Sequence, residues 1–512
     1  MFRSMFTVGG LTLLSRILGL VRDKLIYFFL GTGALGDIWV AAFQLPNLFR
    51  RIFGEGAFNS AFVPLYCRKI EEEGDASANY FASRTLTLMF WLLLVIFAVM
   101  FIFMGPIIRV TNFGFFERGI QDTAVLASRI TIGYLIFVCL MAAFSGVLNS
   151  RKIFGAPALA YAVLNVVLIA TLLVAARFFD NTLIALSYGV LIAGALQLAL
   201  LIGAMIKRKI KVGIVLPVID QDIKKLSILM VPGLISAGVQ QINLLVGGAV
   251  ASLEHGGRSS IYLSDRINQF PLGLIGIAIG VVLLPEISRN LGAGKIDGAR
   301  KSLAFGADMS ILFCIPAMIA MLIIPQYIMH GIFEGGAVSG ADAQNIGTVL
   351  AAFAIGMPAY VLTKVYQPGY YARENTRTPM IFAIVGAVIN MVLCYPLFRL
   401  MGVAGCALAT SISGWVIVAL LWIGLKKDQF VTINGKMISR YIRMFLSAGI
   451  MGAAIWYLGK WGEPWLLKEG HFVTRIVALL TLVLIGVAVY FACIFGTKVF
   501  TISEVKRAVK RS

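Results

Sequence analysis

Apolar stretches of roughly 20 residues recur along the whole chain, separated by short polar segments. A helix of about 20 apolar residues crosses the roughly 30 Å hydrocarbon core of a bilayer, whereas a membrane β-barrel would show short strands of alternating polarity. The pattern therefore predicts an all-α polytopic membrane protein with about 14 transmembrane helices. The predicted spans are 5–30, 36–66, 86–110, 122–148, 156–177, 183–206, 226–252, 262–287, 303–328, 346–371, 379–399, 402–425, 441–460 and 473–496.

Composition supports this class. Of the 512 residues, 59% are hydrophobic and only 13% are charged, whereas soluble domains have about 45–50% apolar and about 25% charged residues. The net charge of +20 would suggest a nucleic-acid partner in a soluble protein. Here most of the excess lies in short loops, where basic residues set topology, so we expect no nucleic-acid partner.

The loop charges also predict the orientation. Loops 31–36, 110–122, 254–260 and 329–345 are poor in basic residues. Because basic loops stay in the cytoplasm, both termini of this multi-pass protein are expected there. No A-x-A cleavage site follows the first apolar stretch, so we expect an uncleaved first helix. The alternate loops are rich in basic residues: Arg68, Lys69, Arg151, Lys152, Lys207, Arg208, Lys209, Arg300, Lys301, Arg373, Arg377, Lys426 and Lys427.

A faint internal repeat divides the chain. Pairs of proline and arginine at helix ends recur after about 221 residues. We expect two six-helix lobes, at 1–210 and 211–430, related by a pseudo-two-fold axis along the membrane normal, and an appended helix pair with a basic cytoplasmic tail at 431–512. The alternative is that proline and arginine are simply common at such helix ends. The matching pairs are Pro64 and Arg68 with Pro285 and Arg289, and Arg151 and Pro157 with Arg373 and Pro379.

The strongest functional signal is charge inside the apolar segments. A mid-membrane Arg or Lys costs about 2.5–3.5 kcal/mol on insertion scales. Such residues persist only if they face a wet cavity, pair with one another or bind a ligand. The polar and charged candidates are Ser15, Arg16, Arg22, Asp23, Lys24, Asp37, Arg50, Arg51, Glu55, Asp265, Arg266 and Lys364.

Ion pairing explains part of this charge. Arg51 and Glu55 have i,i+4 spacing, and Asp23 can reach neighbouring basic residues. The acids do not balance the bases, so several Arg side chains should point into water. The alternative places 50–55 in a cytoplasmic loop and 22–24 at a helix end.

Arg16 and Arg22 lie about 120° apart on an ideal helix. They share a cavity only if the helix bends, for which Gly19 is a candidate, or if the cavity is wide. Surplus guanidinium groups in a hydrated, low-dielectric cavity suit phosphate or carboxylate, which they bind in a bidentate manner. An inside-negative potential helps such an anion outward by about 2.3 kcal/mol per charge per 100 mV. We therefore expect a transporter of an anionic, lipid-linked substrate that depends on membrane potential or an ion gradient.

The chain shows no enzymatic pattern. His255, His330 and His471 fall in the predicted outer loops without spacing for a metal or a nucleophile relay, and no G-x-x-x-x-G-K-[ST] motif is present. The six cysteines form no C-x-x-C pair, so free thiols are expected. We expect no catalytic residues, no metal site and no cofactor.

Three motifs carry a family resemblance. They are Ser15-Arg16-Ile17-Leu18-Gly19-Leu20-Val21-Arg22-Asp23, then Leu45-Pro46-Asn47-Leu48-Phe49-Arg50-Arg51-Ile52-Phe53-Gly54-Glu55-Gly56-Ala57-Phe58, and Ala61-Phe62-Val63-Pro64. The sequence resembles the MurJ (MviN) family of lipid II flippases, in the multidrug/oligosaccharidyl-lipid/polysaccharide exporter superfamily. Asp265-Arg266 and Lys364 lie in segments similar to the family's second-lobe motifs.

The resemblance implies a protein of a bacterial inner membrane. It also implies that lipid II, the undecaprenyl-pyrophosphate-linked muropeptide, is flipped by alternating access for cell-wall synthesis. Arg16, Arg22, Arg50 and Arg266 would bind its head group, and Asp37 and Glu55 would be functional acids that organise the arginines or a gate. Ser15, Asp23, Arg51, Asp265 and Lys364 are weaker candidates. The last two helices would form a groove for the polyprenyl tail. Membrane lipids and cell-wall synthesis proteins are the other expected partners.

Other functions remain as alternatives. A drug or cation antiporter of the same superfamily would need an acidic cavity, whereas the excess here is basic. A flippase for another polyprenyl-linked glycan would share this composition. A non-transporting membrane scaffold for wall-synthesis enzymes would not need unbalanced arginines in its helices.

Overall fold

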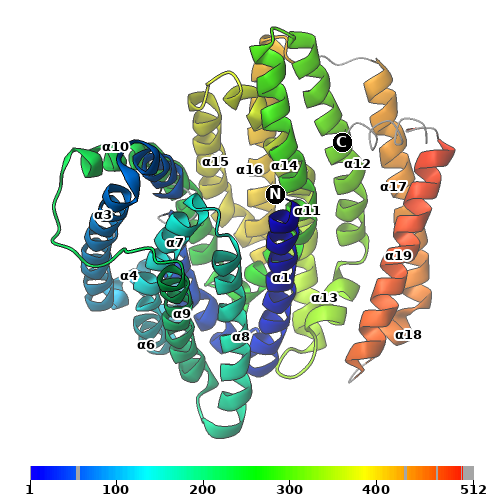
Figure 1. Cartoon of the computed structure of the whole chain (residues 1–512). Helices are drawn as coiled ribbons and strands as arrows, with labels where there is room; N and C mark the ends of the chain where they lie inside the picture. The colour runs from blue at the N-terminus through cyan, green and yellow to red at the C-terminus, as the bar shows by residue number, and fades with distance from the viewer. Residues whose placement is uncertain (1, 53–57, 432–434, 469–470, 498, 500–512) are drawn as a thin grey trace. The chain divides into compact units, whose positions relative to one another are not determined.

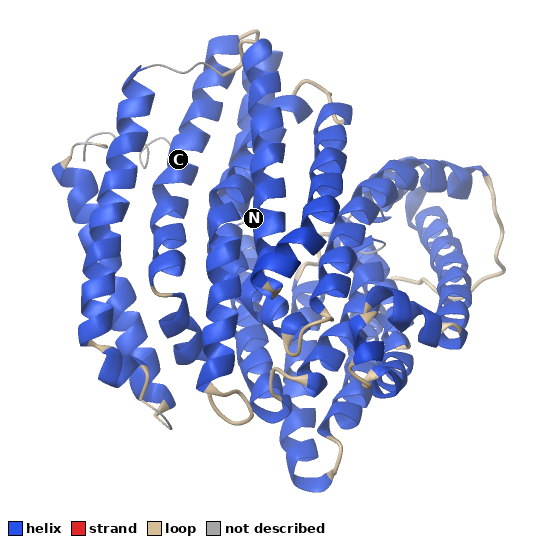
Figure 2. Cartoon of the chain, turned by 180° about the vertical axis from the view of Figure 1, so that it is seen from behind, coloured by secondary structure: helices blue, strands red, loops and turns tan. Residues whose placement is uncertain are grey.

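A computed structural model describes residues 2–52, 58–431, 435–468, 471–497 and 499 (Figure 1). Within these ranges the regular structure is helical, and the one β-type interaction is an isolated bridge between Gly335 and Val338 (Figure 2). The predicted all-α polytopic class is confirmed.

Ten of the described helical segments are long and apolar enough to cross a membrane. The total of fourteen stays a prediction, because the helices Phe2–Leu30, Ala34–Phe49, Gln221–Ala251 and Gly257–Gly292 are not among these ten. The ten segments are Ala61–Ile102, Gln121–Ser150, Gly155–Phe178, Thr182–Lys207, Ile296–Ile323, Gly340–Tyr371, Arg377–Met401, Val403–Lys427, Met437–Trp461 and Phe472–Gly496.

The chain forms two compact units, Met1–Ser259 and Ser260–Ser512. The predicted division at 210 and 430 stays a prediction. Unit 1 contains α1 (Phe2–Leu30), α2 (Ala34–Phe49), α3 (Phe58–Ile102), α4 (Met104–Thr111), α5 (Gly114–Glu117), α6 (Gln121–Ile132), α7 (Tyr134–Ser150), α8 (Gly155–Phe178), α9 (Thr182–Lys207) and α10 (Gln221–Ala251). The first turn of α11 (Gly257–Gly292) belongs to unit 1 and its remainder to unit 2, which continues with α12 (Ile296–Ile323), α13 (Pro325–Phe333), α14 (Gly340–Tyr371), α15 (Arg377–Met401), α16 (Val403–Lys427), α17 (Gly435–Trp461), α18 (Glu463–Leu466) and α19 (Phe472–Gly496).

The predicted span 36–66 is wrong as a single helix. It is divided between α2, which ends at Phe49, and α3, which begins at Phe58. The predicted loop 67–85 is helical instead, because α3 continues through it with a kink at Gly74, whose φ is 83°. Glycine adopts this left-handed conformation without steric cost.

Two acidic residues at the start of α10 bridge this kink. Asp222 pairs with Lys69, before Gly74, at 2.9 Å, and Asp220 pairs with Arg84, after Gly74. Asp220 also caps α10 by accepting a hydrogen bond from a backbone N–H of its first turn. The helix start is therefore tied to both arms of α3.

Arg151, just after α7, bridges the same kink. It donates to the Tyr66 hydroxyl at 3.0 Å and to Oδ1 of Asn79 at 2.9 Å, and it pairs with Asp75 at 2.7 Å. Tyr66 itself donates to Asn79 across the kink. Both arms of α3 are thus held by side chains from two other segments.

In unit 2, α14 packs against α12, α13 and α16, and most of its side chains are buried. Two ion pairs attach the last two long helices to this group. Arg440 on α17 pairs with Asp308 on α12, and Arg475 on α19 pairs with Glu334, just after α13, at 2.5 Å. The final helix pair is therefore joined to the rest of unit 2 by charge as well as by apolar packing.

Candidate functional site

Arg22 lies inside α1 and is buried in a polar cluster. Its Nε and Nη2 donate to Oδ1 of Asp23 at 3.0 and 2.6 Å, and its Nη1 donates to Oδ1 of Asn165 on α8 at 2.9 Å. Asn165 in turn donates to the backbone carbonyl of Ser15 at 3.0 Å. The guanidinium carbon lies 5.8 Å from the Phe43 ring centroid. The predicted pairing of Asp23 is confirmed.

The same cluster corrects two expectations. Arg22 does not present an unpaired guanidinium group, because Asp23 on its own helix neutralises it. The helix-end alternative for 22–24 is also wrong, since α1 continues to Leu30. Arg16 is exposed whereas Arg22 is buried, as expected for two faces of one continuous helix.

Arg50 directly follows α2 and occupies its C-cap position. Its Nε donates to Oδ1 of Asn47 at 3.1 Å. The Arg22 guanidinium lies over the Phe43 ring, and Asn47, the partner of Arg50, donates to the Phe43 carbonyl. Unit 1 therefore brings these two predicted substrate ligands to the same part of α2. Arg51 is exposed.

The remaining candidates are less closely defined. Glu55 lies outside the described residues, so its pairing with Arg51 stays a prediction. In unit 2, Asp265 and Arg266 are half-buried on α11, and Lys364 is exposed on α14. Gln269 donates to Asp265 one turn away. A shared cavity for the four predicted ligands, Arg16, Arg22, Arg50 and Arg266, stays a prediction.

Asp37, at the start of α2, accepts four hydrogen bonds. Its carboxylate is fully buried. Oδ1 accepts hydrogen bonds from the backbone N–H and the hydroxyl of Ser259 at 2.9 and 3.0 Å. Oδ2 accepts from the Gly256 N–H at 2.9 Å and from Arg118 at 2.7 Å. The carboxylate thus lies at the positive N-terminal end of α11, where a negative charge is stabilised.

Arg118 connects the segment around Asp37 with the segment that precedes α11. It also donates to the carbonyls of Ser252 and Glu254 at 3.2 and 3.1 Å. A Cβ at Gly36 would lie 2.3 Å from the Gly31 carbonyl oxygen, so a larger residue cannot fit there without displacement. Segments 31–37, 114–118 and 252–259 therefore form one closely packed cluster. We call it the outer cluster, because the sequence predicts that its loops face away from the cytoplasm.

Arg258, in segment 252–259 of the outer cluster, adds a buried cation to the half-buried Arg118. It donates to Oε1 of Gln44 at 2.8 Å, and a Cβ at Gly248 would lie only 1.6 Å from its Nη1. Burial lowers the pKa of Arg258 to about 10, so it stays charged at neutral pH. Sequence reasoning missed Arg118 and Arg258, although both are basic residues in loops expected to be poor in them, and that exception is the signal that could have found them.

Among the described residues, no group of three or more His, Cys, Asp or Glu side chains is placed to hold a metal ion. The described side chains of the site are guanidinium groups, amides and carboxylates, in a chain with ten segments long and apolar enough to cross a membrane. These features are typical of multi-pass α-helical transporters of charged solutes.

The chain matches the family "Lipid II flippase MurJ" over residues 26–478, and it belongs to that family. It is 36% identical to a probable lipid II flippase MurJ of Rhizobium tropici, over 99% of this chain and 96% of that protein. It is 34% identical to a probable lipid II flippase MurJ of Rickettsia prowazekii, over 98% of each chain.

Solved structures show the same fold. A lipid II flippase MurJ in an inward closed conformation is similar with a TM-score of 0.80 and 27% identity, over 95% of this chain and 97% of that one. An inward-facing multidrug resistance transporter of the MATE family has a TM-score of 0.70 at 13% identity, over 83% and 98% of the two chains. At that identity the second likeness concerns the fold alone. The chain is therefore a multi-pass protein of the bacterial inner membrane with a transporter fold.

Proposed function

We propose that this chain moves lipid II from the inner to the outer leaflet of the bacterial inner membrane for cell-wall synthesis. The observation that carries the proposal is the family match along nearly the whole chain, with 36% identity to a probable flippase. The buried Arg22 and Arg50 at the same part of α2 support it, because guanidinium groups in a low-dielectric environment favour a pyrophosphate head group.

The proposed mechanism is alternating access, with both termini in the cytoplasm. Arg16, Arg22, Arg50 and Arg266 bind the head group while the polyprenyl tail stays in the membrane beside α17 and α19. Because Asp23 is next to Arg22 on the same helix, the incoming anion competes with a carboxylate for that guanidinium group. An anion bound more tightly in one state than in the other shifts the population toward that state.

In this mechanism the outer cluster closes the substrate pathway on the side of the membrane away from the cytoplasm. Asp37 links α2, Arg118 and the start of α11 by hydrogen bonds that no single helix contains. Release of the head group to the outside requires these bonds to break. Outward movement of the anion is assisted by the membrane potential.

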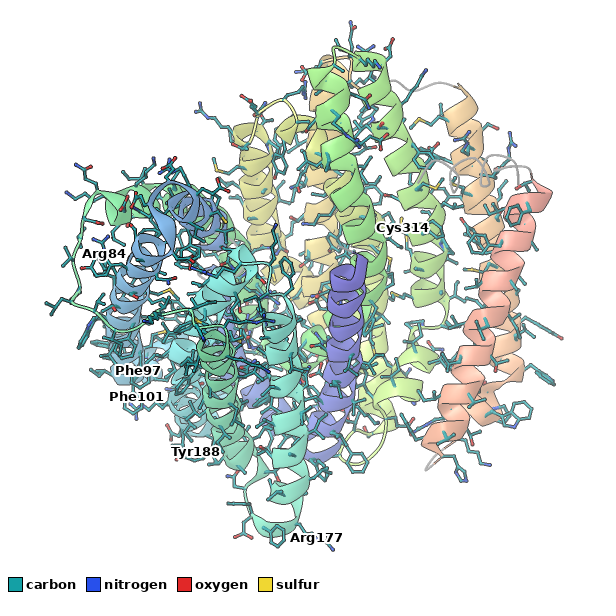
Figure 3. The ribbon with its side chains drawn as sticks, viewed as in Figure 1. Arg84, Phe97, Phe101, Arg177, Tyr188 and Cys314 are labelled. Carbon is teal, nitrogen blue, oxygen red and sulfur yellow. The ribbon has the colours of Figure 1, made fainter. Side chains whose placement is uncertain are left out.

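The test is replacement of the native copy by Arg16→Ala, Arg50→Ala or Arg266→Ala in a strain in which the flippase can be depleted. Each variant should insert normally, fail to restore growth, and leave lipid II on the inner leaflet. Arg177→Ala is the matched control, because Arg177 is exposed in the last turn of α8 (Figure 3). Normal growth of the cavity variants would refute the arginine mechanism.

The same assay separates the alternatives. If depletion stops growth but leaves lipid II distributed as before, the chain acts on another polyprenyl-linked glycan. If every arginine variant supports growth while depletion does not, a scaffold that recruits cell-wall synthesis proteins is the better explanation.

A further inference from the structure

The segment between α9 and α10, residues 208–220, lies along α3 in unit 1 and is not explained by transport. Figure 1 shows it as a long loop that leaves α9 and returns beside α3 to α10. The Gly213 N–H donates to the Ser83 hydroxyl, and the Val215 N–H donates to the Thr87 hydroxyl, both at 3.1 Å. These two contacts, two residues apart, hold the segment in an extended form against α3.

The side chains of this segment are unusually exposed for apolar residues. Ile214 is 87% exposed, Leu216 is 83% exposed and Ile219 is 65% exposed. A contiguous exposed apolar surface rimmed by charge marks an interaction site. Two backbone hydrogen bonds to α3 hold the segment in place, so its exposed apolar side chains form a strip of fixed position.

Position along the chain places the strip at the bilayer surface. The apolar membrane segment Thr182–Lys207 ends where the linker begins. Ser83 and Thr87, which hold the linker, lie within the apolar segment Ala61–Ile102. The strip therefore begins at the end of α9 and is hydrogen-bonded to α3, and both helices contain membrane-length segments.

The charge that is left without an ion pair around the strip is positive. Asp220 and Asp222 form ion pairs with Arg84 and Lys69 on α3. Figure 3 shows Arg84 on α3, near the start of α10. None of the basic residues flanking the strip makes an ion pair within the part of the chain that the structure describes. These flanking residues are Lys207, Arg208, Lys209, Lys211, Lys224 and Lys225.

We propose that residues 207–225 form a docking strip for the anionic lipid surface of the inner leaflet, with Ile214, Leu216 and Ile219 inserted at the headgroup boundary and the basic side chains on lipid phosphates. Exposed apolar side chains and unpaired cations together complement such a surface, since basic residues beside a membrane helix are attracted by anionic headgroups. The assignment to the inner leaflet rests on the predicted cytoplasmic side of this segment, and the proposal does not depend on which solute is transported.

Hydrogen–deuterium exchange of the full-length protein in nanodiscs tests the strip directly. Peptides covering 208–220 should exchange about tenfold more slowly in phosphatidylglycerol than in phosphatidylcholine at the same low salt. The loop 372–376, which carries no apolar strip, is the internal control and should exchange equally in both lipids. Equal exchange of the linker in both lipids would overturn the proposal.

Two variants of the linker separate the contribution of its basic side chains from that of its apolar side chains. The change Lys207→Gln, Arg208→Gln, Lys209→Gln and Lys211→Gln should abolish the phosphatidylglycerol effect, whereas Lys295→Gln, Lys301→Gln, Lys426→Gln and Lys427→Gln should keep it. Ile214→Ser with Leu216→Ser preserves the charge and should also remove most of the protection. Protection that survives both linker variants, or that arises only with added cytosolic protein, would argue against a lipid surface.

Discussion

Two buried aspartates of unit 1 both bind an arginine, yet they do so in different ways. Asp23 pairs with Arg22, its neighbour on α1, so the pair can move with its helix as one body. Asp37 instead joins Arg118 and Ser259, which are 81 and 222 residues away in the chain. A local pair can persist through a rearrangement of helices, whereas bonds between distant segments must break when those segments separate. We infer that Asp23 adjusts how strongly Arg22 binds the substrate, and that Asp37 stabilises the conformation in which the outer cluster is assembled.

The largest effect is expected from Asp37→Ala. It removes the acceptor of four hydrogen bonds and leaves Arg118 without its carboxylate, which should cost about 4 kcal/mol and lower the thermal midpoint. Amide exchange at Gly256 and Ser259 should accelerate, and the variant should fail to support growth.

The matched control is Asp122→Ala, because Asp122 is exposed in the first turn of α6. It should leave the thermal midpoint and the exchange rates unchanged. If Asp37→Ala behaved like this control, the outer cluster would not be a closure.

A somewhat smaller loss is expected from Asp23→Ala. The buried Arg22 would keep Asn165 but lose its counter-charge, at a cost of about 3 kcal/mol in the free energy of unfolding. Exchange at Gly256 and Ser259 should stay as in the unchanged protein. The double variant Arg22→Met with Asp23→Leu should recover most of the thermal midpoint, and failure to recover would show that other contacts of these residues dominate.

The smallest effect is expected from Ser259→Ala. It removes one hydroxyl hydrogen bond to Asp37, worth about 1 kcal/mol, but keeps the backbone N–H bond to the same oxygen. The thermal midpoint should fall slightly while growth is retained. A loss of growth equal to that of Asp37→Ala would assign the hydroxyl itself an essential role.

Sequence reasoning predicted the helical class and most of the helix positions, because long apolar runs leave few alternatives in a bilayer. It also placed Asp23 beside a cation, since that contact is between neighbours. It could not find the partners of Asp37, because Arg118 and Ser259 become neighbours of Asp37 only through tertiary packing. It also misread 67–85 as a loop, although i,i+4 pairs such as Lys69 with Glu73 favour a helix there.

The braced kink of α3 has a mechanical consequence. Gly74 interrupts the helix, so the bend angle is set by the side chains that connect the two arms: Asp220 and Asp222 at the start of α10, and Arg151 just after α7. A displacement of the start of α10 would therefore move both arms of α3 through these ion pairs. The angle between the arms would change at Gly74. Motion at the surface end of the bundle can in this way be converted into tilting of a helix within the membrane.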